Sequence, residues 1–256
     1  MSKFNLLDEP WIAVIDHQGA TRELSLLDFF AQAHLYRDFA GDTKTQDFAV
    51  MRVLLAVLHT VFSRFDATGK PYPYLRLDER YKPSQPIKSD NQDDYEDCLY
   101  HTWLDLYKLG KFPAIVSQYL EKWRERFYLF DEQYPFFQAK QSDIATSKLN
   151  KKSATPIKGR NINRLLSESS TKVALFSPKS GDYKGKLKEG EIVRWLITFH
   201  GFTGLADKSI FGQKKYKASK GWLFDLGGTF LKGNNLFTTL MANFYLPNKA
   251  NNNLQI

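Results

Sequence analysis

The first part of the chain alternates apolar and polar positions in a way that predicts paired strands followed by a helix. Residues 4–14 indicate a first strand interrupted by Pro10, the polar segment 16–21 indicates a hairpin turn, and residues 21–26 indicate the return strand. A helical pattern follows over residues 26–36. We therefore expect a small antiparallel sheet beside a helix.

Polar residues mark where the first two helices begin. Ser25 is the expected N-cap of the helix over residues 26–36, with Asp28 three positions on as an acidic variant of the capping box. Asp42 or Thr43 is the expected cap of a second helix. The apolar side chains of that helix step by three and four, which places them on one face. They are Phe48, Met51, Leu55, Leu58 and Phe62.

Four later segments favour regular structure. Residues 93–109, ended by Gly110, and residues 113–127 indicate helices, whereas 189–204 and 236–245 fit either a helix or a strand.

Long loops separate these segments. Residues 66–90 hold four prolines and predict a loop, and the segment around Pro135 is expected to be extended. The whole pattern predicts the α+β class: one mixed helical and small antiparallel-sheet domain over residues 1–256, with long loops.

Composition excludes several classes of protein. Apolar residues make up 43% of the chain, which predicts a packed core rather than disorder. No apolar run approaches the ~18 residues of a membrane span, and the N-terminus lacks the uninterrupted apolar region of a signal peptide. The single cysteine, Cys98, excludes a disulfide framework and a cysteine-based zinc site within one chain. We expect a cytoplasmic protein without a membrane partner.

The net charge of +8 is concentrated in one basic block, residues 139–220. This block holds 18 Lys and Arg against 6 Asp and Glu, a net of +12, whereas the rest of the chain is net −4. Segregated charge of this kind is typical of a surface that binds a polyanion, and nucleic acid is the first candidate. A solvated lysine-rich surface is the alternative. An anionic membrane is disfavoured because the block is too rich in Gly, Ser and Pro for an amphipathic helix.

Within the block, the segment SIFGQKKYKASKGW, residues 209–222, combines four lysines with aromatic residues and glycines and contains no acid. Lysines neutralise phosphates, glycines allow close backbone approach, and aromatic rings stack on bases. We therefore predict that this segment contacts DNA. The predicted contact residues are Phe211, Gly212, Gln213, Lys214, Lys215, Lys217 and Lys220.

No arrangement in the sequence predicts catalysis. The five histidines are scattered, without a pair at helical metal-binding spacing, and Cys98 is more typical of a packed residue than of a nucleophile. The glycine-rich segment 227–234 lacks the strand–loop–helix spacing of a phosphate cradle, and the acidic run 90–97 is typical of a helix N-terminus. We expect a binding protein with no catalytic residues, metal or cofactor.

Several motifs together resemble the CasA family, the large subunit of the type I-E CRISPR surveillance complex, Cascade. They are NLLDEPWIAV at the N-terminus, VLLAVLHTVFSRF at 53–65 and YPFFQ at 134–138, supported by VALFSPKSG and GGTFLKGNNLFTTLMANF. The resemblance covers essentially the whole chain. Members of the family continue into a C-terminal helical bundle that this chain lacks, so the resemblance implies an N-terminal portion.

The resemblance implies a subunit that is not an enzyme. Such a subunit recognises the protospacer-adjacent motif in double-stranded target DNA, assists duplex opening and helps to recruit the helicase-nuclease. The implied partners are target DNA, guide RNA, other Cascade subunits and the helicase-nuclease.

The resemblance also implies roles for two loops. Leu175, Phe176 and Ser177 correspond to a loop near the 5′ end of the guide RNA and a neighbouring subunit. The stretch from Phe211 to Lys214 corresponds to a glycine-rich loop that approaches the motif in the minor groove. In this chain Gln213 and Lys214 stand where the family has glycines, which adds side-chain donors to the backbone. Some members carry a cysteine-ligated zinc, which a single cysteine does not provide.

Two other functions stay open from the residues alone. In a scaffold subunit of a ribonucleoprotein, the lysines would pair with acidic partner surfaces and other subunits would touch DNA. A nuclease would need a carboxylate or histidine cluster, which the sequence does not indicate.

Overall fold

The computed structural model describes residues 4–138, 140, 187–203, 210–211, 216–217, 221, 223–224 and 226–246. The chain forms two compact units. The first unit comprises Met1–Ile12, Gly41–Val50 and Glu125–Thr229, and the second comprises Ala13–Ala40, Met51–Arg124 and Phe230–Ile256. Each unit draws on three separate stretches of the sequence; the predicted single domain over residues 1–256 stays a prediction.

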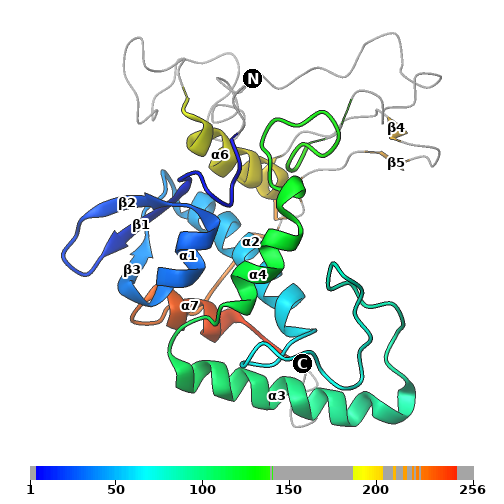
Figure 1. Cartoon of the computed structure of the whole chain (residues 1–256). Helices are drawn as coiled ribbons and strands as arrows, with labels where there is room; N and C mark the ends of the chain where they lie inside the picture. The colour runs from blue at the N-terminus through cyan, green and yellow to red at the C-terminus, as the bar shows by residue number, and fades with distance from the viewer. Residues whose placement is uncertain are drawn as a thin grey trace, which may run out of the picture. The chain divides into compact units, whose positions relative to one another are not determined.

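A three-stranded sheet forms part of the second unit, with strand order β2-β1-β3 (Figure 1). The strands are β1, Ile12–Asp16, β2, Thr21–Leu24, and β3, Tyr36–Phe39. The turn between β1 and β2 is confirmed: the Asp16 carboxylate accepts the Ala20 N–H at 2.8 Å, and Gly19 adopts φ 90°. β1 and β3 pair antiparallel.

Two predictions near the N-terminus are wrong. Residues 6–8 form a turn rather than a strand, since the Asn5 side chain accepts the Leu7 N–H at 2.9 Å and competes with strand pairing there. The expected helix over 26–36 is shorter and is followed by an unpredicted strand. It consists of α1, Leu26–Gln32, then the 3-10 turn η1, Ala33–Leu35, and then β3.

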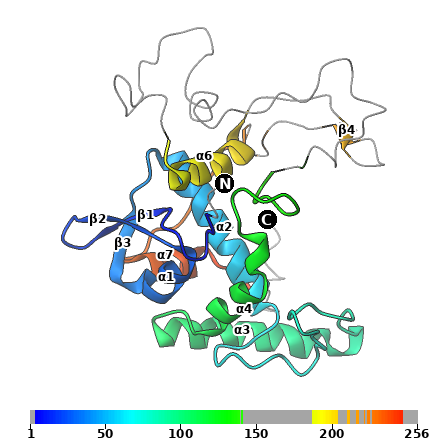
Figure 2. The same ribbon diagram turned by 45° about the horizontal axis from the view of Figure 1, so that its top comes forward.

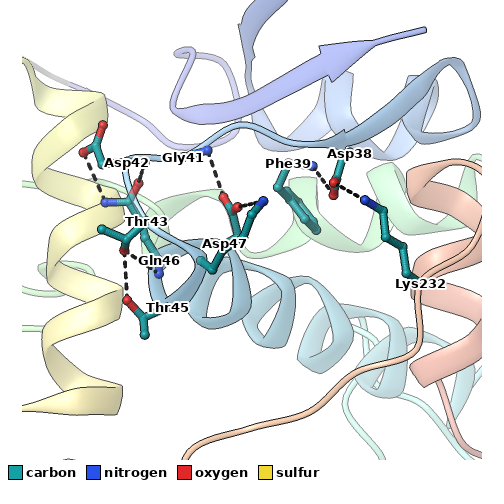
Figure 3. Close-up of polar contacts among 10 residues, drawn as sticks. Asp38, Phe39, Gly41, Asp42, Thr43, Thr45, Gln46, Asp47 and Lys232 are labelled. Carbon is teal, nitrogen blue, oxygen red and sulfur yellow. Dashed lines mark hydrogen bonds and ion pairs between the residues drawn. The ribbon is translucent and has the colours of Figure 1, made fainter. Parts of the chain in front are cut away.

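Both predicted helix caps are present. The Ser25 hydroxyl accepts the Asp28 N–H at 3.1 Å and donates to the Asp28 carboxylate at 2.7 Å. Thr43 caps α2, Lys44–Phe62, where its hydroxyl accepts the Gln46 N–H at 3.1 Å (Figure 3). These bonds satisfy backbone donors that a helix leaves free at its start.

A buried carboxylate reinforces the start of α2. Asp47 accepts the Gly41 N–H at 2.8 Å and the Lys44 ammonium at 2.9 Å (Figure 3). A Cβ on Gly41 would lie 2.6 Å from that carboxylate, so a larger residue at this position would require the Asp47 side chain to move. In the second unit, Figure 3 also shows Lys232 paired with Asp38 of β3.

The apolar stripe of α2 is confirmed with a shift in phase. Met51 and Leu58 are buried as expected, together with Leu54 and Val61, whereas Leu55 is only half-buried. Within the described residues, α2 has the length and apolar composition of a helix that could cross a membrane, contrary to the expectation from apolar runs. Half of its apolar window is buried inside the protein, as in the core helix of a globular protein.

The remaining helices of the second unit are α3, Gln92–Leu109, α4, Ile115–Lys122, and α7, Leu236–Asn243. Gly110 ends α3 in the left-handed conformation, as predicted. α4 is shorter than expected because Trp123 leaves the helical conformation; the 3-10 turn η3, Arg124–Arg126, follows it. The ambiguous segment 236–245 is helical, and α7 packs against η1, β3 and α3 (Figures 1 and 2).

The first unit is held together by the N-terminal segment and α6, Glu189–Phe202. The Leu6 N–H donates to Phe127 O at 2.9 Å and the Leu129 N–H donates to Phe4 O at 3.0 Å, which pairs two distant segments. The sequence allowed either a helix or a strand over 189–204, and the structure has the helix α6 there. α6 packs closely on Trp11, whose carbonyl oxygen accepts a hydrogen bond from Arg194 at 2.8 Å. Helices beside a small sheet confirm the α+β class.

Candidate nucleic-acid interface

Two short strands bracket the central part of the predicted DNA-binding segment. β4, Ile210–Phe211, and β5, Tyr216–Lys217, pair antiparallel in the first unit (Figure 1). Phe211 is paired with Tyr216 and Ile210 with Lys217. Residues 212–215, the sequence GQKK, connect the two strands along the chain. The residues that precede this connection therefore lie beside the residues that follow it.

The segment that carries this strand pair, residues 204–220, is anchored at both ends to the C-terminal end of α6. The Gly221 N–H donates to Thr203 O at 2.7 Å, and the Leu223 N–H donates to Gly201 O at 2.8 Å. A Cβ on Gly221 would lie 2.5 Å from Gly201 O and 2.8 Å from Phe202 N, both backbone atoms. Glycine is therefore required at position 221 for this close backbone approach.

The structure brings only part of the predicted contact set into view. The backbones of Phe211 and Lys217 lie in β4 and β5. The other predicted contact residues lie outside the described residues, as does most of the basic block. They are Gly212, Gln213, Lys214, Lys215 and Lys220, and, in the predicted guide-RNA loop, Leu175, Phe176 and Ser177. Their roles stay predictions.

A second candidate surface, which the sequence analysis did not assign, lies in the loop that follows η3. It forms a pocket of about 300 Å³, here called the loop pocket. Its lining includes two cations, two amides and two exposed aromatic rings: Arg126, Lys140, Gln133, Gln138, Tyr134 and Phe137. No acidic residue lines it within the part of the chain that the structure describes.

The loop around Pro135 is a turn and not the extended segment that the sequence predicted. The Gln138 N–H donates to Pro135 O at 3.1 Å. Phe137 has a φ of 53°, a backbone conformation that residues other than glycine rarely adopt. The Asp131 carboxylate accepts the Tyr134 N–H at 2.6 Å and the Gln133 N–H at 2.8 Å. These two bonds hold the pKa of Asp131 below its usual value.

Sequence reasoning missed this pocket, although its motif was visible. YPFFQ was informative as a family motif, but a positive φ at Phe137 is not readable from residue types. Pro135 next to two phenylalanines was the available signal, since two large apolar residues in a row beside a proline seldom both reach the core. Phe136 is buried, whereas Phe137 is 45% exposed.

The described residues also bear on the absence of catalytic motifs. Among them, no group of three or more His, Cys, Asp and Glu side chains is arranged to hold a metal ion. Cys98 is a half-buried free thiol. Burial, and then the nearby carboxylates of Asp94, Asp97 and Asp66, raise its pKa. A raised pKa keeps the thiol protonated and unreactive near neutral pH.

Known proteins match this chain over most of its length. A family model described as CRISPR-associated protein Cse1 matches residues 5–253. The CRISPR-associated protein CasA/Cse1 of Thermus thermophilus is 30% identical over 139 residues, which are 54% of this chain and 21% of that protein.

Solved structures share the fold. Thermobifida fusca Cse1 is 27% identical, with a TM-score of 0.62 over 93% of this chain and 38% of its own. A chain of a structure described as a CRISPR RNA-guided surveillance complex has a TM-score of 0.61 at 16% identity, over 95% of this chain and 44% of its own, which shows the fold alone. This chain thus spans less than half the length of each of these relatives.

The resemblance seen in the sequence is therefore confirmed by an independent family model and by the fold. Because that model spans residues 5–253, the chain belongs to the CasA/Cse1 family of type I-E CRISPR systems.

Proposed function

We propose that this chain acts in a CRISPR interference complex as a nucleic-acid-binding subunit that recognises the protospacer-adjacent motif in double-stranded DNA. It assists duplex opening and helps to recruit the helicase-nuclease. Its partners are target DNA, guide RNA and the other Cascade subunits, and its role is binding rather than catalysis. Support comes from the family, whose solved relatives include a surveillance complex.

One observation carries the proposal: the paired strands β4 and β5 bracket the sequence GQKK. Lys214 and Lys215 would neutralise phosphates, and Gln213 would offer an amide to base edges. The hydrogen bonds of Gly221 and Leu223 to the end of α6 support this role, because they hold the residues that follow the 204–220 segment against the helix end that precedes it. A fixed base limits the conformational entropy lost on binding.

The test measures duplex DNA binding by the whole chain as a function of salt. Lys214→Ala combined with Lys215→Ala should weaken binding to all sequences and lower the slope of log K against log salt by about two, since each phosphate contact contributes ~0.9. Lys82→Ala combined with Lys88→Ala is the matched control, because both lysines are exposed in the second unit. Equal slopes for the two double variants would contradict the proposal.

Gln213→Ala tests motif reading separately. It should change the preference between motif sequences by roughly 1–3 kcal/mol if the amide contacts a base edge, with little effect on the salt slope. Competition between duplexes that differ only in the motif measures this preference. A uniform loss across all motifs would show that Gln213 does not read bases.

A scaffold role is the second candidate, and exposed apolar side chains favour it. Phe224 and Leu226 follow Gly221 closely in the chain and are 47% and 79% exposed. Exposed apolar side chains mark protein–protein contacts where they form a contiguous patch, and these two would be part of such a patch in a scaffold. Comparing DNA binding by the isolated chain with that of an assembled complex separates the two roles. DNA binding only in the complex, unaffected by the lysine variants, would favour the scaffold.

A further inference from the structure

We propose that the loop pocket binds one unstacked nucleotide of a single-stranded nucleic acid. The inference rests on the proposed function only in its ligand class, and it concerns a different part of the first unit from the 204–220 segment. The volume of about 300 Å³ lies at the lower end of small-molecule sites, so the pocket suits one nucleotide rather than a stacked duplex end.

The cations of the pocket are arranged around one aromatic ring. The Arg126 guanidinium carbon lies 3.5 Å from the centroid of the Tyr134 ring, and the Lys140 ammonium lies 5.9 Å from the same centroid. Stacking orients a guanidinium while leaving its N–H groups able to donate to a phosphate. Arg126 Nε also pairs with the Glu125 carboxylate at 3.6 Å, and the Arg126 side chain is 44% exposed.

One acid close in sequence to the pocket wall is bonded to the backbone. Asp131 accepts the backbone N–H groups of Gln133 and Tyr134, which fixes the turn on which Tyr134 stands. These two bonds direct the carboxylate at the backbone of the loop, and its charge also acts on Lys140 of the wall. Among the described residues that form the wall there are cations and amides but no carboxylate, which favours an anionic ligand.

Phe137 supplies the surface for a base. Its ring is 45% exposed although its backbone is in a conformation that costs roughly 1–3 kcal/mol for such residues. Two contacts support this turn: the Phe137 carbonyl lies 2.6 Å from Nε2 of His200 in α6, and the centroid of the Phe137 ring lies 4.7 Å from that of the buried Phe136.

A strained backbone that holds an aromatic ring in solvent is unfavourable for folding alone. Strain of this kind is characteristic of sites that are preorganised for a ligand. A rigid exposed ring next to cations has the chemistry that single-stranded nucleic-acid sites use, where bases stack on aromatic side chains and the backbone follows positive charge. Free phosphate would not need the ring, and an acidic peptide would not need its flat face.

The experiment uses the whole 256-residue chain, a fluorescent oligothymidylate of about eight nucleotides and a blunt duplex. Phe137→Gly is the central variant, because glycine adopts φ 53° without strain and the fold should be retained. It should weaken single-strand binding at least about fivefold, the fold-change that corresponds to one lost stacked base, and leave duplex binding unchanged. Phe137→Trp should retain single-strand binding.

Two further variants sharpen the readout. Phe130→Ala removes a phenylalanine that is 42% exposed in the same stretch but does not line the pocket, and it should bind as the wild type does. Arg126→Gln should lower the salt slope of single-strand binding by about 0.7, the value for one phosphate contact on a single strand.

The outcomes separate this inference from the proposed function. Normal duplex binding with single-strand binding unaffected by Phe137→Gly overturns the loop-pocket inference alone. No binding of either probe by the wild-type chain overturns both. A glutamate-rich peptide whose binding depends on Phe137, while that of the oligonucleotide does not, would identify an acidic-peptide site and also overturn the inference.

Discussion

At the scale of single residues, the sequence predicted local chemistry well and strained backbone poorly. Ser25, Thr43 and Gly110 act at helix ends as their residue types indicate. Such roles depend on one or two neighbours along the chain, so residue types suffice to predict them. The positive φ of Phe137 could not be predicted from residue types, and the Phe137 carbonyl contacts His200, which is far away in the sequence.

Cys98 gives a prediction at this scale. Its raised pKa places the pH midpoint of alkylation by iodoacetamide above that of the same chain unfolded in urea, where the thiol pKa is about 8.5. The sign follows from burial, which favours the neutral thiol in the fold. The resulting stabilisation is present below the unfolded-state pKa and is lost as pH rises through the folded-state pKa.

The readout is unambiguous because the chain has one cysteine. Comparing pH midpoints rather than rates removes the effect of restricted access. A folded-state midpoint below that of the unfolded chain would indicate an activated thiolate and contradict the packed role.

At the scale of elements, long periodic segments were predicted and short ones were not. The helices α2 and α3 each supply several turns of periodic pattern. The four residues of β3 match the last turn of a helix as well as they match a strand, and only pairing with β1 decides between them. β4 and β5, with two residues each, carry no periodic signal at all.

The close backbone contact between Gly221 and the C-terminal end of α6 gives the prediction at this scale. Gly221→Ala places a Cβ against the backbone of Gly201 and Phe202, which must move apart. The free energy of unfolding in urea should fall by about 1–3 kcal/mol, the usual cost of overpacking. The variant should also weaken DNA binding, because the hydrogen bond that joins residues 203 and 221 is lost.

Gly201→Ala is the matched control from the same backbone contact. Among the described residues, its Cβ would meet only the end of the Leu223 side chain, at 3.3 Å, and alanine favours the helix in which position 201 lies. Its stability should stay within about 1 kcal/mol of the wild type, because a side-chain end can move aside where backbone cannot. Equal losses for the two alanine variants would show that the close backbone approach at Gly221 is unimportant.

At the scale of the whole molecule, the main feature that the sequence predicted is the separation of charge. The block 139–220 has a net charge of +12 against −4 elsewhere. Because charges simply add along the chain, a basic block that favours a polyanion can be identified from the sequence without knowing the fold. The loop pocket was not readable, because it requires Arg126, Tyr134 and Lys140 to gather around one turn.

Elution from a heparin column distinguishes a local footprint from general basicity. Replacing Lys214, Lys215, Lys217 and Lys220 with Gln should lower the salt concentration needed for elution. Replacing the exposed lysines Lys70, Lys82, Lys88 and Lys111 with Gln changes the net charge equally and should have a smaller effect. Equal shifts would favour the solvated lysine-rich surface.

The short hydrogen bonds at Thr203 and Gly221 have a consequence for how this family can diversify. A stretch of chain whose departure and return points touch can change in length and residue content while the helix beneath it keeps the same neighbours. We therefore expect changes in residues 204–220 to be tolerated by the fold and, under the proposed function, to alter which nucleic acid is bound.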